Sequence, residues 1–165
     1  MNYLKGIIFL SSLFILSRII PHPPNFTPIL AGIIFIPFIK KDIRFSLLVP
    51  LGAMLISDFI IGMHGLMLWT YLPIGILSLL TFYFFSDNAL RVGSLAIASP
   101  MVFYLISNFG VWTNSSFYTK DLNGLIECYI SAIPFYANSA VACLLFSCAF
   151  FFIVKFHQRS ILQHN

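Results

Sequence analysis

Residues 45–62 read FSLLVPLGAMLISDFIIG, an apolar run in which Asp58 is the single charged residue. A helix of about 20 such residues crosses the roughly 30 Å hydrocarbon layer of a bilayer. Basic residues stand just before the run, at Lys40, Lys41 and Arg44. The stretch therefore predicts a membrane-spanning helix with its basic end at one membrane surface and Asp58 near the other.

Five further apolar runs flank this one, at residues 4–20, 26–39, 66–85, 92–109 and 133–154. Most are close to the length of a span, whereas 26–39 is shorter, with Pro28 and Pro37 near its ends, and is expected to cross only part of the bilayer. The chain has 165 residues, of which 59% are hydrophobic and 8% are charged, so it has no room for a separate soluble domain. We predict an all-α membrane protein with six transmembrane helices in a single integral membrane domain, 1–165.

The basic residues indicate how the spans are oriented. Alternate gaps between the runs share one side of the membrane, and that side holds Lys5, Lys40, Lys41, Arg44, Arg91, Lys155 and Arg159. Only Arg18 and Lys120 fall on the opposite side. By the positive-inside rule both termini are cytoplasmic. The segment at Lys5 to Leu16 could also be a signal peptide, but no A-x-A-like cleavage site follows it, so we expect a retained first span.

Several function classes are disfavoured by the sequence. The net charge of +4 comes from dispersed basic residues that form no basic face, so no nucleic-acid partner is expected. Cys128, Cys143 and Cys148 have no metal-site spacing, and neither a metal nor a cofactor is predicted. Hydrolase, metalloprotease and nucleotide-binding motifs are missing, so we expect no enzyme. A small membrane enzyme using Asp58 with His22 or His64 remains a weaker alternative.

One loop has helical periodicity of its own. In residues 121–130, Asp121 is a candidate N-cap, and one helical stripe is made by Leu122, Leu125, Ile126, Tyr129 and Ile130. We predict an amphipathic helix on the outer side of the membrane. It either rests in the interface or covers an opening between spans.

Polar and aromatic side chains gather on the same outer side. We predict that those nearest the span ends form a substrate-binding site, made by Arg18, His22, Asn25, Asp58, Asn108, Trp112, Tyr129 and Asn138. An Arg18–Asp58 pair is the simplest way to compensate a carboxylate inside a span. Whether that pair serves structure or contacts the substrate stays open at this stage.

The same residues carry a resemblance to a known family. The motifs are Arg18–Pro28, Ser57-Asp58, Ile106–Trp112, Cys128-Tyr129, Ala132–Phe135 and Asn138. They resemble a family of small, uncharacterised bacterial membrane proteins regarded as transporters. That family is more distantly similar to the S components of energy-coupling-factor (ECF) vitamin transporters, and the solitary cobalamin-type S components are the nearest of these. The resemblance implies an S-component-like bundle in the bacterial inner membrane that takes up a small, vitamin-like solute.

The resemblance also has limits that bear on specificity. In the cobalamin-type proteins a cysteine coordinates the corrinoid metal, and the matching position here is Thr70, a poor ligand for such a site. An Ala-xxx-Ala docking stripe for a shared coupling module is missing from the first span. The partners implied are therefore the lipid bilayer, a small solute and either an ATP-driven coupling module or another membrane subunit. A non-catalytic assembly subunit of a membrane complex is the alternative function.

Overall fold

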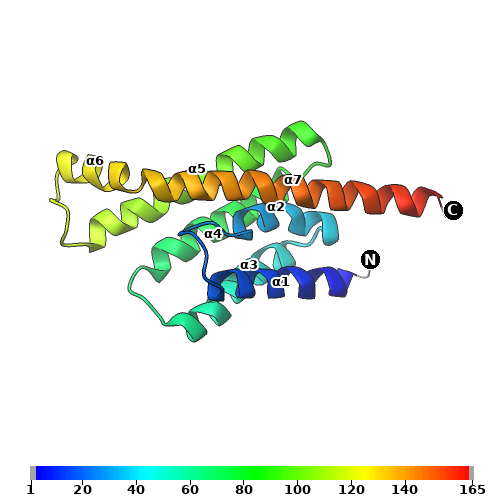
Figure 1. Cartoon of the computed structure of the whole chain (residues 1–165), viewed down its shortest axis with the longest axis horizontal. Helices are drawn as coiled ribbons and strands as arrows, with labels where there is room; N and C mark the ends of the chain where they lie inside the picture. Colours follow the sequence, from blue (N-terminus) through cyan, green and yellow to red (C-terminus); the bar gives the residue numbers. More distant parts are fainter. Residues whose placement is uncertain (1–2, 164–165) are drawn as a thin grey trace.

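The computed structural model describes the backbone of residues 3–163 and the side chains of residues 3–156, so the side chain of Arg159 lies outside the description. The described chain is helical (Figure 1), and its helices are α1 Tyr3–Ile19, α2 Ile29–Ile39, α3 Ile43–Ile61, α4 Met67–Tyr83, α5 Ala89–Asn114, α6 Leu122–Ser131 and α7 Ile133–Gln163. Three stretches are long and apolar enough to cross a membrane: α3, α5 and the Ile133–Phe156 part of α7. Shorter apolar helices are α2 and α4. The structure is thus that of a helical membrane protein.

The helices lie where the apolar runs predict them, with differences at the ends. α5 begins before residue 92 and continues beyond residue 109 to Asn114, and α7 continues beyond residue 154. Both extensions contain polar residues, and the helical backbone hydrogen bonds continue through them. The Asn88 side chain accepts a hydrogen bond from Leu90 N at 2.8 Å and so caps the start of α5.

The short helix α2 forms the centre of the bundle. It contacts α1, α3, α4, α5 and α7, and every residue from Ile29 to Pro37 is buried. Close packing on α1 depends on Gly32, where a Cβ atom would collide with the Phe14 ring. α2 begins at Ile29, and Figure 1 shows its neighbours α5 and α7 continuing past that level, so its first turn forms the floor of an open space.

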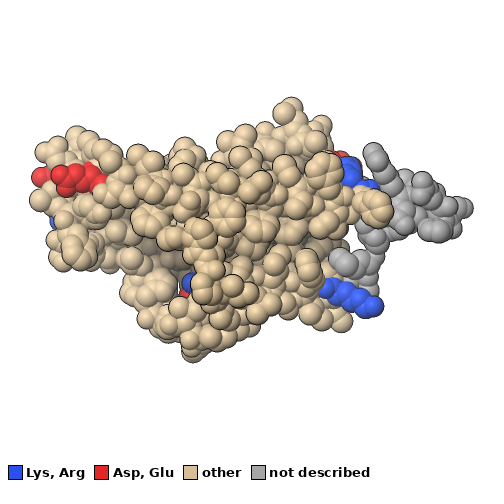
Figure 2. All heavy atoms as spheres, viewed as in Figure 1, with Lys and Arg blue, Asp and Glu red and all other residues tan. Residues whose placement is uncertain are grey.

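The molecule has two distinct ends (Figure 1). The start of α1 and the end of α7 lie at one end, and α6 lies at the other. Figure 2 shows most of the visible basic side chains at the end that holds the start of α1, and a hollow near the middle of the face. Lys40 and Lys41 precede α3 and Arg91 lies in the first turn of α5, and Figure 1 shows both helices starting at the same end as α1. We refer to the opposite end, where α1 and α3 end and α4 and α7 begin, as the pocket end.

Candidate functional site

A network of three side chains ties α1, α3 and α4 together at the pocket end. Arg18 Nη2 lies 2.5 Å from Asp58 Oδ1, which confirms the predicted ion pair. Tyr71 donates its hydroxyl proton to Asp58 Oδ2 at 2.7 Å. The Asp58 side chain is 1% exposed, so its charge is compensated within the protein and not by water.

Arg18 makes further bonds to α3. Its Nη1 group donates to the Met54 carbonyl at 3.1 Å and to Ser57 Oγ at 2.7 Å. The residue lies in the last turn of α1, where a positive charge is also favoured by the helix dipole. These contacts hold the guanidinium against α3.

Above this network the protein is hollowed by two adjoining chambers. The first, of about 320 Å³, has aliphatic walls that include Ile29, Ile61 and Ile74, and we call it the isoleucine chamber. The second, of about 300 Å³, has walls that include Tyr104, Ser107 and Tyr136, and we call it the tyrosine chamber. Five residues line both chambers and so mark their junction: Arg18, Asn25, Thr70, Phe103 and Ser139.

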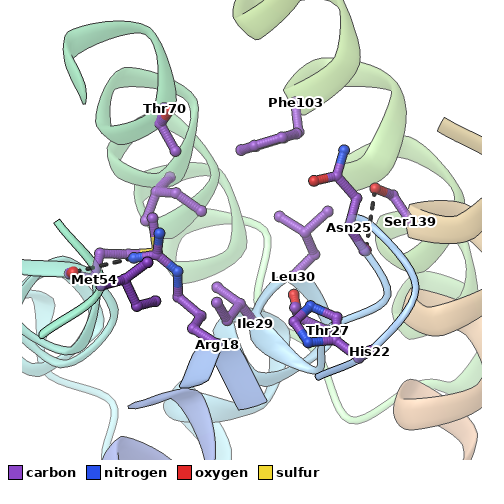
Figure 3. Close-up of a pocket in the computed structure, with 12 residues that line it drawn as sticks. Arg18, His22, Asn25, Thr27, Ile29, Leu30, Met54, Thr70, Phe103 and Ser139 are labelled. Atoms are coloured by element: carbon purple, nitrogen blue, oxygen red, sulfur yellow. Dashed lines mark hydrogen bonds between the residues drawn. The ribbon is translucent and has the colours of Figure 1, made fainter. Parts of the chain in front are cut away.

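The structure brings four of the predicted site residues to these chambers. Arg18 and Asn25 lie at the junction, His22 lines the isoleucine chamber and Asn108 lines the tyrosine chamber. Figure 3 shows Arg18 and Asn25 on opposite sides of the cavity, with Thr70 on the side of Arg18 and Phe103 between the two sides. Asp58 lies behind Arg18 and reaches the chambers only through it.

The other three predicted residues make bonds that hold the walls in place. Asn138 Nδ2 donates to the Pro24 carbonyl at 3.0 Å. Tyr129 donates its hydroxyl proton to the Leu105 carbonyl at 2.6 Å, joining α6 to α5. Trp112 Nε1 donates to the Thr119 carbonyl at 2.8 Å and fixes the loop before α6. In this structure they position the site and do not line it.

The loop between α1 and α2 presents Asn25 in an unusual backbone conformation. Its φ of 62° is the one positive φ at a non-glycine position among the described residues. Asn138 bonds the Pro24 carbonyl, and Ser139 Oγ donates to the Asn25 carbonyl at 3.4 Å. The loop backbone is thus fixed to α7, and the Asn25 amide faces the junction of the chambers (Figure 3).

Several lining residues are not predicted by the sequence patterns. Ser139 belongs to a small-residue packing stripe with Cys143 and Ser147, and it is both buried and part of the junction. Phe103 and Ser107 lie inside a continuous apolar run and carry no signal of their own. Tyr71, the third member of the charge network, is also not predicted. The one feature of the sequence that could have indicated it is a tyrosine inside an apolar run.

α6 is amphipathic, as predicted, and Asp121 is its N-cap. The Asp121 carboxylate accepts hydrogen bonds from Gly124 N and from the Thr119 hydroxyl, both at 2.8 Å, and these bonds lower the pKa of Asp121. Leu122, Ile126 and Ile130 are exposed along one side of the helix. The helix contacts α5 and α7, and the residues that line the two chambers come from other elements. This placement favours a helix resting in the interface over a lid.

Among the described residues, no group of three or more His, Cys, Asp or Glu side chains is arranged to hold a metal ion.

A family of unknown function (DUF6580) matches residues 3–164, which is nearly the whole chain. The chain belongs to this family. Comparison with curated proteins and with solved structures found no match. Within DUF6580 the similarity to ECF S components therefore stays a prediction from the motifs.

Proposed function

We propose that this protein binds a small solute in the two chambers and carries it across the membrane, in the manner of an S component. The proposed topology has six spans, α1 to α5 and α7, in a bacterial inner membrane. Both termini are cytoplasmic and the pocket end faces outward. The solute is small and vitamin-like, and the protein itself has no catalytic role.

The observation that carries this proposal is an open pocket with a few polar groups among membrane helices. Small-molecule sites are concave and mostly apolar, with a few convergent polar groups. The chambers have aliphatic and aromatic walls that hold Arg18, Asn25 and Asn108. The gathering of Lys40, Lys41 and Arg91 at the other end supports the outward orientation of the pocket.

Two other functions receive less support. A non-catalytic assembly subunit has no need for a polar pocket of this volume. An enzyme based on Asp58 needs a free carboxylate beside a histidine, whereas the Asp58 oxygens are occupied by Arg18 and Tyr71. Since the sequence has no nucleotide-binding motif, the energy for transport comes, in this proposal, from an ATP-driven partner, another membrane subunit or an ion gradient.

The test is the thermal stability of the purified protein in detergent with vitamins, corrinoids, nucleobases and amino acids. A solute that binds the folded state at 100 times its Kd stabilises the protein by about 2.7 kcal/mol. Thr70→Trp would fill the junction and should abolish the shift. Leu68→Trp, on the same helix with Leu68 67% exposed, is the matched control and should retain it. A shift that survives Thr70→Trp would place the ligand elsewhere, and a panel without any shift would favour the assembly subunit.

A further inference from the structure

Apart from the imidazoles of His22 and His64, the two chambers carry almost no net charge, although a guanidinium lines both. Among the described residues of their walls, Arg18 is the only Lys, Arg, Asp or Glu. Asp58 neutralises it from behind at 2.5 Å. The Nη1 donors are directed at Met54 and Ser57, and Figure 3 shows the bond to Met54 turning away from the cavity.

This charge distribution disfavours ions of either sign. An anionic solute would meet a cation that is already paired with a buried carboxylate, and it would have to compete with that carboxylate. A cationic solute would meet no carboxylate in either wall, because Asp58 is 1% exposed behind Arg18. Removing an ion from water without a partner is far more costly than removing a hydrogen-bonded neutral group.

The chambers also differ from each other in chemistry. The isoleucine chamber offers Ile29, Ile61 and Ile74, which suit an apolar ring or chain. The tyrosine chamber offers the hydroxyls of Tyr104, Ser107 and Tyr136, the amide of Asn108 and the imidazole of His64. Several of these groups already bond the backbone: Tyr104 donates to the Tyr129 carbonyl, Ser107 to the Phe103 carbonyl and Asn108 to the Tyr104 carbonyl.

At the junction, the polar group that is available to bond a ligand is the side-chain amide of Asn25. Its backbone carbonyl accepts from Ser139, while its side-chain amide faces both chambers. A positive φ is uncommon outside glycine, although asparagine tolerates it better than most residues, and it persists where the surrounding structure enforces it, often at ligand sites. An amide can donate and accept at once, so it recognises a neutral polar group.

We propose that the solute is an uncharged amphipathic molecule whose apolar part fills the isoleucine chamber while its amide, carbonyl or hydroxyl group bonds Asn25 at the junction. This inference rests on the proposed solute-binding function and specifies its substrate class. Asn25 is then the residue that determines specificity, and Arg18 with Asp58 supports the wall.

Three probes with one ring system and different charges test the class. They are indole-3-acetamide, indole-3-acetate and tryptamine, each at about 10 mM. They are added to the detergent-purified protein at about pH 8, where the acetate is an anion and tryptamine is a cation. The expected result is a rise in the thermal midpoint with the neutral acetamide, which Thr70→Trp abolishes. The ions should give at most about a tenth of its affinity, a difference of roughly 1.4 kcal/mol.

Asn25→Gly tests the recognition step. Glycine keeps the positive φ without strain and removes the amide, so the unliganded protein should be as stable as before or more so. The affinity for indole-3-acetamide should fall about tenfold, the effect of one lost hydrogen bond. Asn123→Ala, at an exposed position of α6 outside both chambers, should leave the affinity unchanged.

The possible failures are distinct. Preferential stabilisation by indole-3-acetate or tryptamine would overturn the uncharged class and leave solute binding intact. Unchanged acetamide affinity in Asn25→Gly would overturn the role of Asn25. No stabilisation by any of the three would overturn the inference, and if the broader panel of vitamins, corrinoids, nucleobases and amino acids also gave none, the proposed function would fail with it.

Discussion

At the scale of single residues, the decisive feature is a buried carboxylate with two partners from two other helices. Asp58 is paired with the Arg18 guanidinium and accepts a hydrogen bond from the Tyr71 hydroxyl. Removing one partner of a buried ion pair leaves an uncompensated charge, which costs more than the pair contributes. The network therefore contributes mainly to the stability of the fold. It affects the pocket only by fixing the position of Arg18.

We expect Asp58→Asn to lower the free energy of unfolding by about 3–5 kcal/mol, because Arg18 keeps its charge without a counterion. Tyr71→Phe should cost less, about 1.5–3 kcal/mol, the range for a hydrogen bond to a charged group. Chemical denaturation in detergent would measure both. The double variant Arg18→Gln with Asp58→Asn, which leaves no charge behind, should be more stable than Asp58→Asn alone. A double variant no more stable than Asp58→Asn would argue against an uncompensated charge.

The candidate site is partly predictable at this scale. Arg18 and Asp58 stand out because charges are rare in spans, and their pairing follows from the need for compensation. The sequence also predicts that Trp112, Tyr129 and Asn138 contact the solute, but in this structure their polar atoms bond backbone carbonyls. An amide or an aromatic ring near the end of a span can either bind a solute or bond the protein's own backbone. Which of the two it does depends on where the neighbouring carbonyls lie in the fold.

At the scale of elements, the packing of α1 against α2 depends on one glycine. A Cβ atom at Gly32 would overlap the Phe14 ring, which is buried between the helices. Gly32→Ala should therefore lower the unfolding free energy by about 1–3 kcal/mol, as overpacking does. Gly52→Ala in α3 is the matched control, because a Cβ there meets nothing within 4 Å. The control should be neutral or slightly stabilising, since Ala favours helix over Gly by up to about 1 kcal/mol.

The start of α6 should respond to acid. Hydrogen bonds from Gly124 N and the Thr119 hydroxyl hold the pKa of Asp121 below its usual range, so the folded state binds this proton less readily than the unfolded chain. The contribution of this cap to stability is complete above the pKa that Asp121 has in the unfolded chain. It is lost as the pH falls through the lower pKa of the folded state. Amide exchange at Gly124 should accelerate, relative to the intrinsic rate, as the pH falls below 3.8, the ordinary pKa of an aspartate. The Asp121→Asn variant keeps a capping side chain that does not titrate, and an equal pH response in that variant would contradict the assignment.

The elements are more predictable than their arrangement. Apolar runs and the loop periodicity locate every described helix, because span length and the 3.6-residue repeat are local properties. The central position of α2 is not predictable, since its short length is equally consistent with an edge helix. Its burial on all sides follows from contacts with five other helices, which are set by the whole chain.

At the scale of the whole molecule, the proposed orientation makes a labelling prediction. Phe117 is 92% exposed in the loop at the pocket end, and Asp87 is exposed in the loop between α4 and α5 at the other end. In cells carrying variants without native cysteines, Phe117→Cys should react with a membrane-impermeant maleimide, and Asp87→Cys should react only after the membrane is permeabilised. The reverse pattern would invert the topology, and labelling of both in intact cells would contradict an odd number of spans between them.

The short central helix has an electrical consequence for the proposed transporter. With 11 residues at 1.5 Å each, α2 is about 16 Å long, roughly half of a 30 Å hydrocarbon layer. Water that enters the chambers reaches its first turn, at Ile29 and Leu30. In this arrangement most of the transmembrane voltage falls across the thin layer that α2 fills, so the local field there is stronger than in the surrounding bilayer. An uncharged solute would cross that layer without electrical work.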